Sequence, residues 1–511
     1  MQIALIVDPA NVRRWHERLR DRLTGLLPHA KIQLFAAEGA DGYSTSVELL
    51  LTLERMLLRH GRPTLSDRSA IKLPPYSPDT FASGDWIIDL RGTSAPLIHR
   101  DATVLRPLYD GLPAEDQAVA MILGGAVPSI AIENTANHHS VAGGRPSFEA
   151  ADGLTGGLEA LFSRVITLIE QKLLSPHRPD LGAVEIEPHQ AKRGPSAFFL
   201  RNIARECVRR IYRLCCHSPH WRIGWRFIDG PGVVETGSLS GPQWQTLPDA
   251  SVAFSADPFP FEWQGQTCLF FERLDYRNGK GLIYAQKFDA KGPVGEAELV
   301  IEEPWHLSYP FLIVHKGELY MVPEASLSGA LYIYRCVEFP GKWQREGQLL
   351  NGIEAADATI FEHAGRFWMT SVIRDGIGGY SDTLAIHHAP DLLGPWEEHA
   401  QRPVLMDSRF ARPAGAIVEV NGALIRPVQD CSTGYGKALA LMRIDKLDTE
   451  NFAQTRKALI EPGPKWPGTR LHTINRAGRL ECIDGVVITP KSAPLARRLH
   501  DTLDRRAAAA S

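Results

Sequence analysis

The sequence predicts a multidomain protein in which a Rossmann-like α/β domain precedes a five-bladed β-propeller. Three observations lead to this fold class. Residues 1 to about 175 alternate short apolar runs with helical patterns, which favours an α/β domain. After about residue 251 the apolar runs are short, aromatic and β-branched, and Gly, Pro, Asn or Asp separates them. This second part also repeats itself about every 50 residues, the size of one propeller blade.

The first part is expected to form a parallel sheet covered by helices on both faces. Strands are predicted over residues 2–7, 31–36 and 85–90. Helices are predicted over residues 46–59 and 158–174, and one more around the helically spaced set Trp15, Leu19, Leu23 and Leu27.

The repeats of the second part align on four anchor residues, which are separated by 52, 48 and 55 positions: Asp257, Tyr309, Asp357 and Arg412. Each repeat has a strand that leads into a turn glycine, and a second strand follows: Gly265, Gly317, Gly365 and Gly422. Seven residues after each glycine stand Glu272, Glu324, Val372 and Gln429. Such a constant register predicts equivalent blades.

A weaker fifth copy begins at His472, 60 residues after Arg412. The aromatic run Trp221–Phe227 precedes the first repeat, and we expect it to add an outer strand that closes the ring with the last blade. The predicted organisation is an α/β domain over residues 1–190, a linker helix over 191–220, the propeller over 221–490 and a helical tail over 491–511.

Equivalent positions of successive blades should converge at the propeller axis, and here they carry polar residues where strand cores usually carry Val, Ile or Leu. We predict a sugar pocket there, because paired carboxylates can serve as acid and as base or nucleophile in glycosidic chemistry. The candidates on the strands are Asp257, Glu272, His306, Tyr309, Glu324, Asp357, Arg412, Gln429, Asp430 and His472, and Trp263 and Tyr435 offer aromatic faces. Turn formation by Asp257 and structural hydrogen bonding by Asp357 or Glu324 are the alternatives.

The motif order ADPFPFEW, HLSYPF, VPEAS, DAT, RPAG and RPVQD resembles the propeller of the glucosamine inositolphosphorylceramide transferase N-terminal family, a relative of the family 43 and 32 glycoside hydrolase propellers. The resemblance covers roughly residues 251–490. It implies that Asp257 is the catalytic base or nucleophile, Asp357 a stabilising carboxylate and Glu324 the acid.

Three functions follow from these residues. The first is a glycosyltransferase that moves a sugar, with furanoses the first choice by resemblance, from an activated donor to a glycan or lipid-linked acceptor. The second is a glycosidase that acts on furanosides. The third is a non-catalytic carbohydrate-binding propeller. No cofactor beyond the activated donor and no metal-ligand cluster is predicted.

The first part is similar to a formyltransferase-like domain through the segment GGRPSFEAADGLTG. Formyltransferases use an Asn, a His and an Asp, and Asn137 with His138 or His139 lies near the expected place. No downstream Asp-Gly partner follows, so the resemblance implies a degenerate scaffold or a sugar-nucleotide-binding domain. No GxGxxG follows the first strand, so a dinucleotide is not indicated.

The charge balance of 56 basic and 59 acidic residues gives a net charge of −3, so nucleic acid is a poor candidate partner. Seven cysteines without CxxC spacing favour reduced thiols. The first apolar run ends at Asp8 and does not resemble a signal peptide, so a cytoplasmic location is expected, with the inner face of the membrane as a peripheral site.

Residues 198–216 contain Arg201, Arg205, Arg209 and Arg213 at intervals of four, beside an apolar stripe. This pattern predicts a basic amphipathic helix that can rest on an anionic lipid surface or beside a lipid-linked substrate. A connecting helix packed between domains, with solvated arginines, is the alternative.

Overall fold

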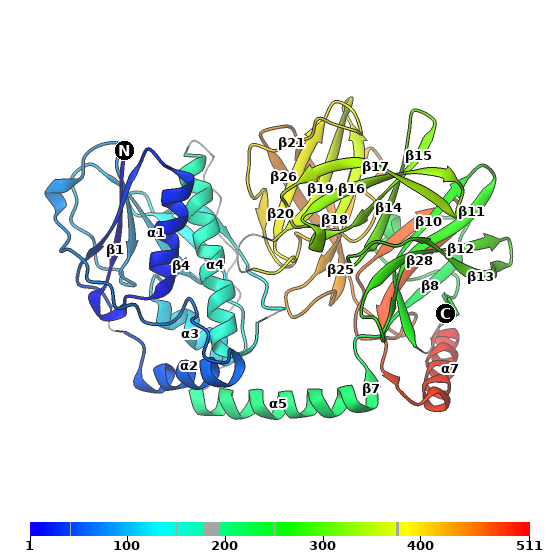
Figure 1. Ribbon diagram of the computed structural model, residues 1–511, viewed down its shortest axis with the longest axis horizontal. Coiled ribbons are helices and arrows are strands. Elements are labelled where there is room, and N and C mark those ends of the chain that lie inside the picture. The colour runs from blue at the N-terminus through cyan, green and yellow to red at the C-terminus, as the bar shows by residue number, and fades with distance from the viewer. Residues whose placement is uncertain (41, 150, 177–193, 249–251, 375–377, 511) are drawn as a thin grey trace. The chain divides into compact units, whose positions relative to one another are not determined.

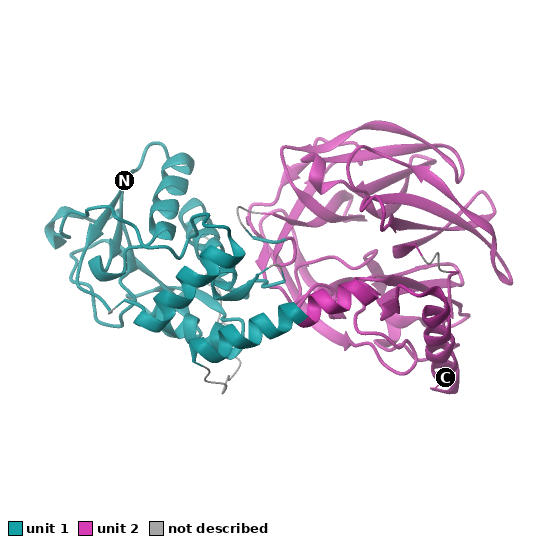
Figure 2. Cartoon of the chain, turned by 60° about the horizontal axis from the view of Figure 1, so that its bottom comes forward, with its two compact units in different colours: residues 1–207, 375–379 teal, residues 208–374, 380–511 magenta. Residues whose placement is uncertain are grey.

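The computed structural model describes residues 1–40, 42–149, 151–176, 194–248, 252–374 and 378–510. The chain divides into two compact units, residues 1–207 with 375–379 and residues 208–374 with 380–511 (Figure 2). The division falls within helix α5 (Pro195–Cys215). None of the described helices is both long enough and apolar enough to cross a membrane.

Unit 1 contains a six-stranded sheet in the order β2-β1-β3-β4-β5-β6 (Figure 1). Its strands are β1 (Gln2–Val7), β2 (Lys31–Ala36), β3 (Trp86–Leu90), β4 (Thr103–Tyr109), β5 (Ile130–Asn134) and β6 (His139–Gly144). The first four pair in parallel, but β5 and β6 pair antiparallel, so the prediction of an all-parallel sheet was wrong. A four-residue connection joins β5 to β6, and so short a connection permits only a hairpin.

Besides the first part of α5, the helices that the structure describes in this unit are α1 (Arg14–Leu26), α2 (Thr45–Leu58), α3 (Glu115–Gly124) and α4 (Gly153–Leu174), with 3-10 turns at Pro9–Asn11 and Pro78–Thr80. Three of the four helices match predicted ones; α3 was not predicted. Trp15 of α1 stacks on Phe162 of α4 with ring centroids 4.8 Å apart. Both side chains are fully buried, so the helically spaced residues of the first pattern do face the core.

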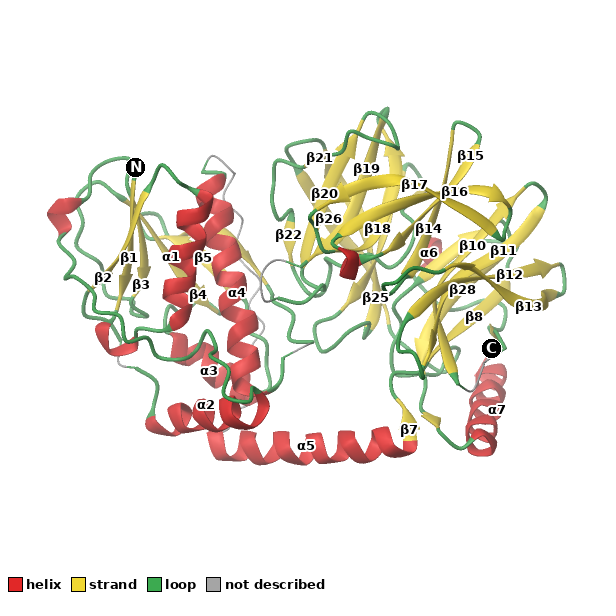
Figure 3. Ribbon diagram, viewed as in Figure 1, coloured by secondary structure: helices red, strands yellow, loops and turns green. Residues whose placement is uncertain are grey.

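Unit 2 is the predicted five-bladed propeller (Figure 3). The first three blades are β10 (Ala253–Trp263), β11 (Gln266–Asp275), β12 (Gly281–Asp289) and β13 (Gly292–Ile301); β14 (Ser308–His315), β15 (Glu318–Glu324), β16 (Ala330–Glu338) and β17 (Lys342–Asn351); and β18 (Ala355–His363), β19 (Arg366–Ile373), β20 (Thr383–Ala389), β21 (Glu397–Glu398) and β22 (Leu405–Met406). The fourth blade is β23 (Val418–Val420), β24 (Ala423–Asp430), β25 (Ala438–Leu447) and β26 (Phe452–Ile460).

The fifth blade closes the ring with strands from both ends of the propeller sequence. It has the order β27 (Ile474–Ala477), β28 (Leu480–Val486), β8 (Trp221–Phe227) and β9 (Gln245–Thr246). The prediction that Trp221–Phe227 supplies an outer strand to the last blade is confirmed, since Ile223 pairs with Asp484 across the two strands. This pairing ties the start of the propeller to its end without leaving an open edge.

Short elements complete the unit: α6 (Val233–Thr236), a 3-10 turn at Ser326–Ser328, and the strand pair β7 (Cys216–His217) with β29 (Thr489–Pro490). The tail forms α7 (Ala493–Ala510), as predicted. Asp504 of α7 accepts a hydrogen bond from Arg222 of β8 at 2.8 Å, so the tail helix is fixed to the fifth blade.

Candidate active site

The anchor residues of the first three blades share an unusual backbone conformation. Asp257, Tyr309 and Asp357 have φ angles of 51°, 43° and 55°, in the left-handed region that non-glycine residues rarely adopt. Each lies at a break in register between the first and second strands of its blade. The strain recurs at three equivalent positions, which indicates that it serves to aim these side chains.

The Asp257 carboxylate is held by groups from two other blades. Its oxygens accept hydrogen bonds from the backbone N–H of Tyr309 at 3.2 Å and from the Thr473 hydroxyl at 2.8 Å. The Nε2 atom of His472 lies 3.5 Å from the same oxygen that Thr473 contacts. Blades one, two and five therefore meet at this carboxylate, as the repeat register predicted.

His472 is in turn fixed by Asp484, a residue of β28 that sequence reasoning missed. The imidazole Nδ1 and the Asp484 carboxylate are 2.6 Å apart, and Trp221 stacks on the ring at 3.8 Å between centroids. Asp484 also accepts the backbone N–H groups of Asp257, His472 and Thr473. The sequence signal that could have identified Asp484 was its position on the second strand after His472 in the fifth repeat.

The ligand atoms of Asp257, His472 and Asp484 lie within 4.8 Å of one another, so this group has the composition of a cation site. The hydrogen bonds of these three residues favour an orienting role over the binding of a cation. Both oxygens of Asp484 already accept N–H groups, and Nδ1 of His472 is bonded to one of them. The arrangement fits a chain of hydrogen bonds that orients His472 toward Asp257.

A second group forms around Asp357 of the third blade. Its carboxylate accepts hydrogen bonds from Arg412 Nε at 2.6 Å and from Gln429 Nε2 at 3.1 Å, both from the fourth blade. The Arg412 Nη2 atom also lies 3.9 Å from Glu324 of the second blade. The guanidinium stands 4.6 Å from the centre of the Tyr435 ring, so a single cation joins two carboxylates and an aromatic face.

The two groups affect each other electrostatically. Burial raises the pKa of Asp257 to about 6, with the charge of His472 acting against this rise and that of Asp357 adding to it. Burial raises the pKa of Asp357 to about 7, with the charge of Arg412 opposing the rise and that of Glu324 adding to it. Burial, then the carboxylates of Asp257 and Glu324, raise the pKa of Glu272 well above its ordinary value. Acids from three blades thus occupy one volume.

Solvent reaches this cluster at two of its members. The side chain of His306 is 28% exposed and that of Glu324 is 12% exposed, whereas Asp257 and Asp357 are buried. His306 Nε2 lies 3.3 Å from Glu272, and its Nδ1 accepts the backbone N–H of Gly281 at 3.0 Å. His306 therefore stands between the buried acids and solvent.

Two predicted residues do not join the cluster. Trp263 lies at the far end of β10 from Asp257 and packs against the apolar core of the blades. Asp430 follows Gln429 directly on β24, so its side chain points to the opposite face of the strand. It accepts the backbone N–H of Ser432 and lies 3.9 Å from Lys437. Trp263 was predicted as an aromatic face and Asp430 as part of the second-strand register beside Gln429, and neither prediction took strand length or side-chain alternation into account.

The formyltransferase-like candidates of unit 1 are also spread on the surface. Asn137, His138 and His139 occupy the exposed turn of the β5–β6 hairpin. Asn137 accepts the backbone N–H of His139 at 3.0 Å, and His138 lies 2.9 Å from Glu133. They stabilise the turn and form no enclosed site.

Unit 1 instead buries a polar cluster around Glu115 of α3. This carboxylate accepts hydrogen bonds from Tyr43 at 2.7 Å and from the Trp15 indole at 3.1 Å, and His16 Nε2 lies 3.7 Å away. His16 is fully buried, and burial lowers its pKa. The cluster connects α1 to α3, which is a structural use of these polar groups.

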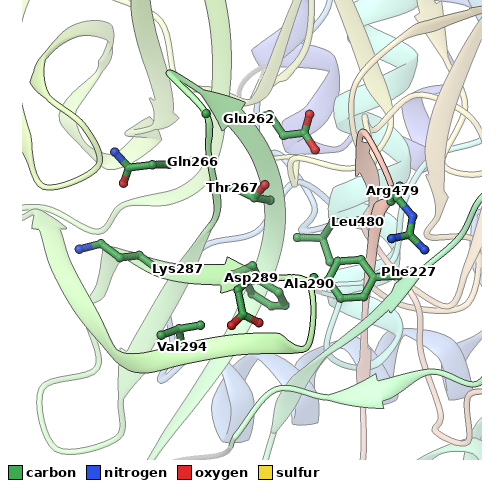
Figure 4. A pocket seen from close by; sticks show the side chains of 12 residues that line it. Phe227, Glu262, Gln266, Thr267, Lys287, Asp289, Ala290, Val294, Arg479 and Leu480 are labelled. Atoms are coloured by element: carbon green, nitrogen blue, oxygen red, sulfur yellow. The ribbon is translucent and has the colours of Figure 1, made fainter.

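Two hollows lie apart from the axial cluster. A groove of about 560 Å³ is found where the β10–β11 and β12–β13 hairpin turns meet blade five (Figure 4), lined by Phe227, Glu262, Gln266, Thr267, Lys287, Asp289 and Arg479 among others. A cavity of about 260 Å³ lies among inner-strand residues and includes Phe259, Phe261, Phe311 and Leu312. Neither contains a predicted site residue.

Gly281 offers a first test of how tightly the site is packed. A Cβ atom there would stand 2.5 Å from the Leu307 carbonyl oxygen and 2.6 Å from Glu272 Oε1. Gly281→Ala should displace the Glu272–His306 pair and lower the free energy of unfolding by about 1–3 kcal/mol, as overpacking does. Urea unfolding of the full chain measures it. Gly347→Ala, at a strand glycine with open space around it, is the control; equal losses for both variants would contradict the packing.

The raised pKa values also predict how stability depends on pH. Asp257 and Asp357, with pKa values of about 6 and about 7, stay protonated in the folded protein above the pH at which they ionise in the unfolded chain. The folded state binds more protons between about pH 4 and pH 7, so stability should fall as pH rises through this window, by on the order of a few kcal/mol. Urea unfolding at pH 5 and pH 8 tests this, and Asp357→Asn should make the fall shallower. A stability that rises across the window would contradict the assignment.

Comparison with known proteins identifies a family whose members resemble the propeller. Residues 245–482 match the family model described as glucosamine inositolphosphorylceramide transferase 1, N-terminal. The resemblance inferred from the sequence is confirmed. The matched residues run from the outer strand β9 to the fifth blade and contain Asp257, Glu324, Asp357, Arg412 and His472.

Relatives with the same description occur in plants. Glucosamine inositolphosphorylceramide transferase 1 of Oryza sativa subsp. indica is 34% identical over 233 residues, which are 43% of this chain and 31% of that protein. The Arabidopsis thaliana protein of the same name is 34% identical over 229 residues, 43% of this chain and 30% of that protein. The chain thus spans about a third of the length of the curated relatives it matches.

Among solved structures, the chain is similar to a family 43 β-xylosidase/α-arabinofuranosidase from a compost microbial metagenome, with 16% identity and a TM-score of 0.34 over 47% of this chain and 92% of that one. It is also similar to a family 117 glycoside hydrolase of Zobellia galactanivorans, with 12% identity and a TM-score of 0.34 over 48% and 77% of the two chains.

Proposed function

We propose that this chain is a glycosyltransferase that binds a sugar at the propeller axis and transfers it to an acceptor hydroxyl. The observation that carries the proposal is the convergence of Asp257, Glu272, Glu324 and Asp357 beside two histidines and an arginine. The plant relatives are named as transferases of a sugar to a lipid, which agrees in reaction class.

In this proposal Asp257 is the general base. With a pKa of about 6 it is mostly ionised at pH 7, and its partners Thr473 and Tyr309 fix its orientation. The acceptor oxygen bonds to the anomeric carbon while its proton passes to Asp257. The bond from the anomeric carbon to the leaving group breaks, and the electron pair leaves with that group.

Asp357 and Glu324 act as one unit on the opposite side of the reaction. Arg412 lies 2.6 Å from Asp357 and 3.9 Å from Glu324, and burial raises the pKa of Asp357 to about 7, with Arg412 opposing and Glu324 adding to the rise. Glu324, the more exposed of the two, is the acid that gives a proton to the leaving-group oxygen, and Arg412 holds it beside Asp357. Asp357 itself is a positioning residue.

The experiment is a turnover assay of the full chain with nucleotide-linked and lipid-linked sugar donors, furanose donors included. Acceptors are simple glycans and inositolphosphoryl lipids, and glucosamine donors with inositolphosphorylceramide are included because the relatives' names specify them. Transfer detected by mass spectrometry is the expected result. Release of sugar to water without an acceptor would identify a glycosidase instead, and binding without any turnover would identify a carbohydrate-binding propeller.

The variant His472→Gln tests how the rate in this mechanism depends on pH. The charge of His472 lowers the pKa of Asp257, so removing it should raise that pKa and move the acidic limb of the kcat/KM profile to higher pH. Rates measured from pH 5 to pH 8 show the shift. His387→Gln, at a buried histidine of blade three, is the control. An unchanged acidic limb in His472→Gln would remove Asp257 from the role of base.

A further inference from the structure

Helix α5 exposes almost all of its length. Of its residues from Pro195 to Cys215, only Phe198 is buried. Five large apolar side chains are between 45% and 76% exposed: Leu200, Ile203, Val208, Ile211 and Leu214. Within the part of the chain that the structure describes, α5 therefore leaves an apolar face that no other element covers.

The apolar and basic side chains of α5 lie on different faces. At about 100° per residue, the five apolar residues together with Ala204, Cys207 and Cys215 fall within an arc of about 140°. The remaining arc carries the buried or half-buried Phe198, Phe199, Asn202 and Tyr212 together with five arginines and one acid: Arg201, Arg205, Arg209, Arg210, Arg213 and Glu206. Arg201 and Arg210 lie at the two borders of the apolar arc.

The charges decide which partner fits this face. A second copy of the helix packed on the apolar face would bring the border residues Arg201 and Arg210 of both copies together, which costs free energy through repulsion. An apolar arc of about 140° is also broader than the narrow seam of a two-stranded coiled coil. An apolar face bordered by arginines matches instead the boundary between lipid tails and anionic headgroups.

We propose that α5 binds the surface of a membrane that contains anionic lipids. The apolar arc enters the boundary between headgroups and acyl chains, and the arginines contact lipid phosphates. The proposal concerns a different element from the axial cluster and stands whether or not the chain transfers sugars.

The test is co-sedimentation of the full chain with vesicles of phosphatidylcholine alone and with about 30% phosphatidylglycerol. Binding should be at least tenfold tighter to the anionic vesicles and should weaken as salt rises. The double variant Ile211→Gln, Leu214→Gln should weaken it at least tenfold, because it removes two of the most exposed apolar side chains. Arg201→Gln with Arg210→Gln, at the two borders of the apolar arc, should weaken it about fivefold per arginine at low salt.

The control is Val337→Gln with Leu393→Gln, two propeller residues that are 58% and 48% exposed, which should leave binding unchanged. Circular dichroism checks that each variant is folded. Equal binding to both kinds of vesicle, or no binding, would overturn the proposal. So would a concentration-dependent dimer that the Ile211 and Leu214 changes abolish while vesicle binding persists, because a second copy would then be the occupant of this face.

Discussion

Asp257→Asn is expected to reduce turnover of the donor by roughly 10²–10⁴-fold while leaving donor affinity within a few-fold, because it removes a general base and keeps the shape of the side chain. The amide oxygen can accept the backbone N–H of Tyr309, and the Thr473 hydroxyl can turn to accept from the amide NH2 group, so the fold of the site should persist. Steady-state rates give the loss of kcat, and titration calorimetry gives the affinity.

Asp445→Asn is the matched control, because Asp445 is a carboxylate of blade four that is paired with Arg443 and lies outside the axial cluster. It should turn over donor at the rate of the unaltered protein. Turnover by Asp257→Asn at that same rate would refute the assignment of the base. A parallel loss in both variants would point to a general defect of the propeller.

Arg412→Met is expected to lower the free energy of unfolding of the propeller by about 3–5 kcal/mol, because it leaves buried carboxyl groups without their cation. Arg412 contacts Asp357 at 2.6 Å and Glu324 at 3.9 Å, and all three side chains have at most 12% exposure. The loss should grow as pH rises from 5 to 8, since the pKa of Asp357 is about 7 and its charge appears in this range. Urea unfolding at both pH values measures it.

The double variant Arg412→Met, Asp357→Asn completes the comparison. It should recover a large part of the loss, because the uncompensated charge is then absent. Arg479→Met removes an exposed pair with Asp229, which solvent screens, and should leave the free energy of unfolding nearly unchanged. If Arg412→Met lowered the free energy of unfolding no more than Arg479→Met does, the result would contradict the contact of the second, third and fourth blades through Arg412.

The propeller could be predicted from the sequence because the same residue pattern recurs in successive blades. The register of Asp257, Tyr309, Asp357 and Arg412 identified the blades, and the aromatic run of β8 could then be assigned to the open edge of the last blade. The α/β domain has no such repetition. Its antiparallel strands β5 and β6 are set by a short hairpin connection, which hydrophobic patterning alone does not distinguish from a parallel arrangement.

The convergence of the candidate residues was predictable to the same extent. Most residues of the repeat register came together, whereas Trp263, chosen as an aromatic face, and Asp430, chosen beside Gln429, did not. Asp484 was missed because it lies outside the anchor positions and acts only through His472 and three backbone N–H groups. The pairing of Arg412 with Asp357 depends on the spatial order of blades, which is fixed only when the ring closes.

The most direct test of the axial site is a crystal structure of the Asp257→Asn protein with the donor that the unaltered protein turns over. The sugar ring is predicted to lie at the axis, in contact with residue 257 and the Glu324 carboxylate. A sugar bound in the groove of Figure 4 or in unit 1, with no sugar at the axis, would contradict the account.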